Sequence, residues 1–177
     1  MPNSLLQNQT ETEKRIDFSR QELLEGLKDR KWRLNNLYWI KDDKGNRIKF
    51  KLNWVQEFLL DNLWFLNVVL KARQLGITTF FCILYLDDCV FNGLDCGLIA
   101  HTLQDATKIF DTKIKYAWDN LPETIKNKFS LNFDNTRELQ FSRDKITSSI
   151  YVGTSLRSGT VQRLHISIES VPWMQSA

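Results

Sequence analysis

The sequence has few of the residues that build metal sites and disulfide frameworks. Its 177 residues include three cysteines and two histidines. Cys82, Cys89 and Cys96 are evenly spaced and form no Cys-x-x-Cys pair, so a zinc site is not expected. An odd number of cysteines in a chain without a secretion signal is typical of reduced, buried thiols.

Long apolar runs are also missing. Polar residues such as Asn67, Lys71 and Asp87 interrupt the most hydrophobic region, so no run reaches the roughly 18 residues that a membrane-spanning helix needs. The opening residues, "MPNSLLQNQTETEKR", lack an apolar core after a basic region, so no signal peptide is predicted. With 42% hydrophobic and 25% charged residues, we expect one globular, intracellular domain without a membrane partner.

The net charge of +3 is too small to indicate a polyanionic partner by itself, although it allows a local basic face. Four lysines in the second half of the chain could contact DNA. They are Lys113, Lys115, Lys126 and Lys128. An ordinary solvated face is the more usual explanation of such lysines, so charge alone does not identify a nucleic-acid site.

Hydrophobic periodicity and turn signals predict alternating helices and strands. The expected elements are a short helix opened by a capping box of Ser19 and Glu22, a hairpin within 37–53, a helix over 54–67, a strand before and a helix (78–92) after a short polar loop, a strand at 96–102, a helix at 103–121, a hairpin within 138–155 and a strand at 161–170. This order is typical of an α/β sheet with helices on its faces.

The segment "VVLKARQLGITTFF", residues 68–81, has the shape of a phosphate-binding loop but not its usual residues. A standard P-loop reads G-x-x-x-x-G-K-[ST] and wraps phosphates at a helix N-terminus. If Gly76 is the second glycine and Thr78 the hydroxyl residue, then Lys71 replaces the first glycine and Ile77 the lysine. Either the segment is not a P-loop or the lysine has moved.

Side chains around this loop have the chemistry that nucleotide binding needs. Lys71 offers a flexible positive charge, and Arg73 offers a planar fork that matches phosphate oxygens. Thr78 and Thr79 open the following helix, where a hydroxyl could ligand Mg²⁺. A short connection with its charges in water explains the pattern about as well, so the loop alone does not decide.

Three residues elsewhere are candidates for the same site. Gln56 on the preceding helix could bond the edge of an adenine, or it could be a plain surface residue. Arg157 is the charged residue of the loop "GTSLRSGT", which could equally be a turn. Glu169 is the acid of the strand "LHISIE" and would share a face with Ser167 in a regular strand.

Four blocks in a fixed order then connect these candidates. They are "WRLNNLYWIKDDKGNRIKFKLNWVQEFLLDN", "LKARQLGITT", "GLIAHTLQDATKIF" and "VGTSLRSGTVQRLHIS", and they lie between Trp32 and Ser167. Together they resemble the N-terminal ATPase part of the large terminase subunit of tailed bacteriophages. Terminases resemble P-loop motors with a deviant Walker A motif, in which R-Q-x-G replaces the glycine-rich form and some members carry the lysine at the start of the loop.

The resemblance implies a fold and a domain organisation. It implies a P-loop NTPase-type, largely parallel α/β sheet flanked by helices and preceded by an N-terminal helix and a hairpin. Residues 1–31 would form a polar N-terminal segment with the short helix, and residues 32–177 a partial terminase ATPase domain. The ending "ESVPWMQSA" does not resemble the family, and the nuclease domain is not part of this sequence.

The resemblance also implies roles for individual residues, with ATP and Mg²⁺ as ligands. Lys71 would be the displaced lysine, Arg73 and Gln74 would belong to the R-Q-x-G motif, Gly76 would allow close backbone approach, Thr78 would bind Mg²⁺ through its hydroxyl, Thr79 would be its neighbour at the helix N-terminus, Gln56 would read adenine, Arg157 would sense the nucleotide and Glu169 would be the catalytic base. Relatives that share "LHIS" place a glutamate directly after the serine, whereas Ile168 intervenes here.

By resemblance, the complete protein would use ATP to drive double-stranded DNA into a procapsid. The implied partners are DNA, the small terminase subunit, the portal protein and further copies of the chain in a homo-oligomeric ring, in the cytoplasm of a bacterial host. Two alternatives stay open. The chain could be a truncated, non-catalytic prophage remnant, or a helicase-like P-loop ATPase of another family.

Overall fold

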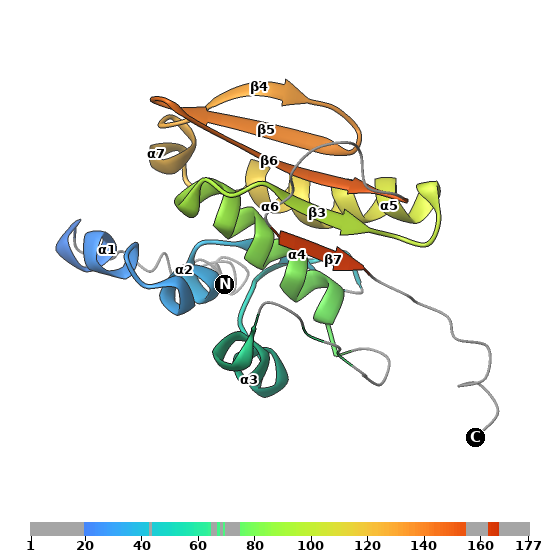
Figure 1. Cartoon of the computed structure of the whole chain (residues 1–177). Coiled ribbons are helices and arrows are strands. Elements are labelled where there is room, and N and C mark those ends of the chain that lie inside the picture. The colour runs from blue at the N-terminus through green and yellow to red at the C-terminus, as the bar shows by residue number, and fades with distance from the viewer. Residues whose placement is uncertain are drawn as a thin grey trace, which may run out of the picture.

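The computed structural model describes residues 20–42, 44–64, 67, 69, 75–154 and 163–166. Figure 1 shows a twisted sheet with helices packed against it. The elements are α1 (Arg20–Gly26), α2 (Arg30–Asn36), β1 (Trp39–Lys41), β2 (Arg47–Lys49), α3 (Trp54–Asn62), α4 (Ile77–Asp87), η1 (Asp88–Asn92), β3 (Cys96–Ile99), α5 (Leu103–Ile109), η2 (Phe110–Lys115), α6 (Tyr116–Asp119), α7 (Glu123–Lys126), β4 (Ser130–Asp134), β5 (Glu138–Arg143), β6 (Ile146–Gly153) and β7 (Arg163–Ile166), where η marks a π-helical segment.

The larger sheet is mixed, which makes the chain a mixed α/β protein. Its strand order is β4-β5-β6-β3-β7. Strand β3 is parallel to both β6 and β7, whereas β5 is antiparallel to both β4 and β6. The expected parallel arrangement therefore holds for β6, β3 and β7, and β4 with β5 adds an antiparallel part. Strand β4 was not predicted, and its pairing with β5 has an irregularity between Leu131 and Phe133.

Helix α4 lies at the centre of the fold. Every side chain from Phe80 to Asp87 is buried, as expected for a helix that is apolar on all sides. It packs against α2, η2 and β3. The helix continues as η1 and ends at Gly93, whose φ of 67° is a conformation that favours glycine. The chain then turns back into β3, so the N-terminus of α4 lies toward the end of the sheet at which β3 and β7 finish (Figure 1).

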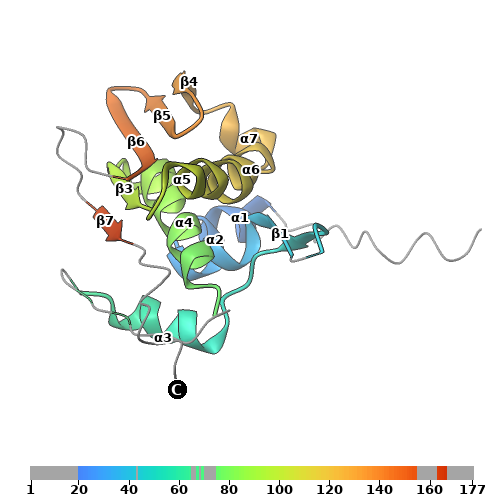
Figure 2. The same ribbon diagram turned by 90° about the vertical axis from the view of Figure 1, so that its right-hand side faces the viewer.

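Segments α5, η2 and α6 form one helical rod that packs on the same side of the sheet as α4 (Figure 2). Thr102 caps its start by accepting a hydrogen bond from the amide of Asp105 at 3.1 Å. At its other end, the ring of Trp118 contacts Phe141 of β5, with 4.7 Å between the centroids. The rod confirms the position of the predicted helix at 103–121, although its middle is π-helical.

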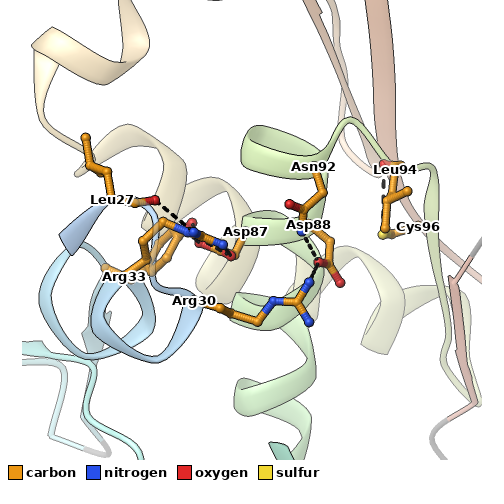
Figure 3. Close-up of polar contacts among 9 residues, drawn as sticks. Leu27, Arg30, Arg33, Asp87, Asp88, Asn92, Leu94 and Cys96 are labelled. Atoms are coloured by element: carbon orange, nitrogen blue, oxygen red, sulfur yellow. Dashed lines mark hydrogen bonds and ion pairs between the residues drawn. The ribbon is translucent and has the colours of Figure 1, made fainter. Parts of the chain in front are cut away.

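A buried polar network joins α2 to the C-terminal end of α4 (Figure 3). The guanidinium of Arg33 donates to both carboxylate oxygens of Asp87, at 2.9 Å from Nε to Oδ1 and 2.7 Å from Nη2 to Oδ2. Tyr38 donates its hydroxyl to Oδ1 of Asp87 at 2.9 Å. Burial alone would lower the pKa of Arg33, but the hydrogen bond and the charge of Asp87 raise it above its usual value. Nearby, Arg30 forms an ion pair with Asp88 at 2.7 Å.

Other local predictions can be compared directly with the described residues. The hairpin is confirmed, since β1 pairs antiparallel with β2 and Gly45 in the turn has a φ of 83°. Helix α3 ends at Asn62 instead of continuing to residue 67, and the described Val69 is not in a strand. Helix α2 was missed, although the N-cap Asp29, which accepts from the amide of Lys31, was a readable signal. Ser19 of the predicted capping box lies outside the described residues.

The three cysteines are all buried and unpaired, which confirms the prediction of free, buried thiols. Burial raises the pKa of the Cys82 thiol to about 12, although the charge of Lys113 acts against this. In the described part of the chain, no helix has the length and apolar character to cross a membrane.

Candidate functional site

An open pocket of about 260 Å³ lies between the β1–β2 hairpin, the start of α3, the start of α4 and η2. Its lining residues are Ile40, Lys41, Asp42, Phe50, Lys51, Asn53, Gln56, Gly76, Thr79 and Lys113. The lining combines two apolar side chains with three lysines and one carboxylate. An anionic ligand with an apolar part would match this composition.

The start of α4 forms one wall of the pocket. The first hydrogen bond of the helix runs from the amide of Phe80 to the carbonyl of Gly76, at 2.9 Å. The amides of Ile77, Thr78 and Thr79 precede it and therefore have no carbonyl partner within the helix. These amides and the helix dipole favour negative charge at this end of α4.

Gly76 has a φ of 66°, a left-handed conformation that strains other residues. A Cβ at this position would also lie 2.9 Å from Nε2 of Gln56. Both the backbone conformation and the neighbouring side chain therefore require glycine here. The predicted role of Gly76 in close ligand approach stays a prediction, and the glycine allows close approach by Gln56.

Gln56 is buried and connects α3 to the segment that enters α4. Its Oε1 accepts from the amide of Asn53 at 3.2 Å, as part of a capping box. Its Nε2 donates to the carbonyls of Leu75 and Gly76 at 3.3 and 3.2 Å. Gln56 is therefore not the plain surface residue that the sequence allowed. Both Nε2 protons of Gln56 are donated to backbone carbonyls, so in the described structure the side chain of Gln56 holds the backbone of Leu75 and Gly76 in place.

Thr79 and Lys113 meet inside the pocket. Lys113 Nζ donates to the Thr79 hydroxyl at 2.8 Å, across a sequence separation of 34 residues. Both side chains are partly buried. No sequence pattern indicates that these two residues are neighbours, and Lys113 was expected either to face DNA or to lie on a solvated face. Another lysine of that group, Lys126, instead pairs with Glu123 at 2.7 Å.

Two other charged groups of the pocket, Asp42 and Lys41, have contacts of their own. The Asp42 carboxylate accepts from the amides of Lys44 and Asn46 and from the Asn46 side chain. The side-chain hydrogen bond from Asn46 is the main cause that lowers the pKa of Asp42. Lys41 Nζ lies 4.7 Å from the centroid of the Tyr116 ring. Because the Asp42 carboxylate is hydrogen-bonded within its own turn, the three lysines keep the pocket positive overall.

The predicted site residues are only partly brought together. Gln56, Gly76 and Thr79 line the pocket, whereas the partly buried Thr78 is not among the described lining residues. Ile77, at the usual lysine position, is 3% exposed and belongs to the core. Five predicted site residues lie outside the described ranges, namely Lys71, Arg73, Gln74, Arg157 and Glu169.

The assignment of Mg²⁺ to the Thr78 hydroxyl comes from the resemblance. Mg²⁺ in nucleotide sites binds through carboxylates, hydroxyls, water and phosphate oxygens. In the ranges that the structure covers, no group of three or more His, Cys, Asp and Glu side chains could hold a metal ion. The assignment of Mg²⁺ to Thr78 therefore stays a prediction.

A comparison of the chain with models of known protein families and with curated proteins found no match. The resemblance to terminases is therefore carried by the four sequence blocks. The basic pocket at the start of α4 is a separate observation, because it depends on the fold and on residues such as Lys113 whose role the blocks do not indicate.

Proposed function

We propose that this chain binds ATP through a P-loop-type site at the start of α4, as the ATPase part of a terminase large subunit that packages viral DNA. The observation that carries the proposal is the basic pocket at the point where the segment "LKARQLGITT" enters α4. The motif is a pattern in the sequence and the pocket is a feature of the fold, and the two coincide at Gly76 and Thr79.

The position of the pocket in the fold supports nucleotide binding. In open α/β sheets, ligands bind beyond the carboxyl ends of the parallel strands. The N-terminus of α4 lies toward the end at which the parallel strands β3 and β7 finish (Figure 1). A helix N-terminus in this place provides amides for phosphate oxygens, and the lysines add positive charge.

The lining also suggests how a nucleotide would lie. Ile40 and Phe50 form an apolar region on the hairpin side, which suits the base. Gly76, Thr79 and Lys113 form the polar, positive side, which suits the phosphates. The volume of about 260 Å³ is slightly below the roughly 300–1,000 Å³ typical of small-molecule sites, and the pocket is open. We therefore infer that it holds part of the nucleotide and that the rest extends toward the loop.

Titration of the purified chain with ATP tests the proposal, with affinity measured by calorimetry. We expect saturable binding by the wild type and about ten-fold or more weaker binding by Lys71→Ala, because a charge-assisted hydrogen bond to phosphate contributes about 1.5–3 kcal/mol. Lys128→Ala, an exposed lysine outside the pocket, is the control and should bind as the wild type does. A wild type that does not bind ATP would refute the proposal.

Measurement of ATP turnover in the same samples separates a motor domain from a non-catalytic remnant. Ile168 sets Glu169 one position later than in the resembling family, and a shift of one residue along a strand turns a side chain to the other face. A positioned general base contributes about 10²–10⁴ in rate, so binding with almost no hydrolysis is expected. Brisk hydrolysis that deletion of Ile168 leaves unchanged would show that Glu169 is not displaced.

A further inference from the structure

We propose that Lys113 of η2 binds the nucleotide phosphates and supplies the charge that the usual P-loop lysine would provide from α4. This inference rests on the proposed ATP site and assigns a binding residue to it. It does not require Lys71 to be idle, because a triphosphate has enough oxygen atoms for several donors.

Helix α4 cannot supply this charge itself. Ile77 stands where the standard motif has its lysine, and its side chain is 3% exposed and packed in the core. The next two residues carry hydroxyl groups and no charge. If phosphates bind at this helix terminus, their countercharge has to come from a neighbouring segment.

Lys113 is the neighbouring charge that the fold brings to this place. Its Nζ atom is hydrogen-bonded to the hydroxyl of Thr79, in the first turn of α4. An ammonium group has three donors, and Thr79 takes one of them. Among the described residues, no carboxylate forms an ion pair with Lys113. Two donors and the full charge are thus available to a ligand that enters the pocket.

The surroundings of Lys113 make it better suited to this role than the other two pocket lysines. Lys41 and Lys51 are exposed on the hairpin, where water screens their charge. Lys113 is partly buried, and electrostatic attraction is stronger where water is excluded. Its segment is also firmly held, since the flanking Phe110 and Ile114 are fully buried.

The π-helical form of η2 is consistent with a functional role. π-helical turns are rare and occur frequently at functional sites. Within η2, residues 110–115, the segment carries Lys113 at the pocket wall. The hydrogen bond to Thr79 fixes the ammonium before a ligand arrives, which reduces the side-chain entropy that binding would otherwise cost.

The test compares Lys113→Ala and Lys113→Gln with a matched control, Lys108→Ala, which removes an exposed lysine from the same helical rod. Displacement of a fluorescent ATP analogue gives the affinities for ATP and for adenosine, which has no phosphate. We expect both Lys113 variants to bind ATP about ten-fold or more weakly and to bind adenosine as the wild type does. Lys108→Ala should match the wild type for both ligands, and Lys113→Arg should recover part of the ATP affinity.

The possible outcomes separate this inference from the proposed function. If the wild type binds ATP and the folded Lys113→Gln protein binds it equally well, Lys113 is not a phosphate ligand and the ATP site stands. If ATP and adenosine weaken by the same factor, Lys113 supports only the shape of the pocket and the inference fails. If the wild type binds no ATP, both the inference and the proposed function are wrong. Circular dichroism of each variant establishes that the protein compared is folded.

Discussion

Replacement of Asp87 by asparagine should destabilise this protein more than most single changes, because Asp87 is the centre of a buried charge network. Its side chain is fully buried, and that of its partner Arg33 is 6% exposed. Asparagine keeps the volume of aspartate, so little of the effect comes from a cavity. The substitution leaves the buried Arg33 guanidinium without the carboxylate to which it is hydrogen-bonded.

The expected loss of stability in Asp87→Asn follows from the contacts of the Asp87 side chain. Asp87 accepts from Nε and Nη2 of Arg33 and from the Tyr38 hydroxyl, at 2.7–2.9 Å for the shortest contact with each donor atom. Removal of one partner from a buried ion pair destabilises a protein by about 3–5 kcal/mol. Since a domain is typically stable by about 5–15 kcal/mol, Asp87→Asn should lose a large part of the total free energy of unfolding.

Urea unfolding followed by tryptophan fluorescence measures this free energy, since the chain contains six tryptophans. The control is Glu123→Gln, which breaks the pair with Lys126, where the Glu123 side chain is 73% exposed. That surface pair should contribute no more than about 1 kcal/mol. If Asp87→Asn lost no more stability than the control, the network would not anchor α2 to α4 as described.

The remaining predictions concern Gln56 and the thiols. Gln56→Ala should weaken ATP and GTP by a similar factor, because Gln56 holds the backbone of Leu75 and Gly76; a selective loss of ATP in a binding assay would instead support adenine reading. The buried thiols should resist iodoacetamide at neutral pH until urea unfolds the chain, as measured by mass spectrometry. Burial raises the pKa of the Cys82 thiol from 9.0 to about 12. The contribution of this thiol to the free energy of unfolding should therefore be complete below pH 9 and fall as the pH rises toward 12.

Elements with strong local signals could be predicted from the sequence alone. The β1–β2 hairpin, α4, β3 and the β5–β6 hairpin lie where turn residues and apolar periodicity placed them. These signals are local, because a glycine such as Gly45 or a run of apolar residues acts on its own segment whatever it packs against. Gly76 was identified from the sequence as the second glycine of a P-loop pattern, and the structure places it directly before α4.

The tertiary structure alone decided how these elements combine into a site. No sequence pattern pairs Thr79 with Lys113, because the contact depends on how η2 packs against α4. The sequence suggested Gln56 as a ligand-reading residue, whereas the fold uses its amide to tie α3 to the start of α4. It also gave no reason to pair Arg33 with Asp87, whose separation of 54 residues is closed only when α2 packs on α4. Such pairings depend on non-local packing, since a side chain's partners are set by which faces of distant segments meet, and composition and spacing do not contain that information.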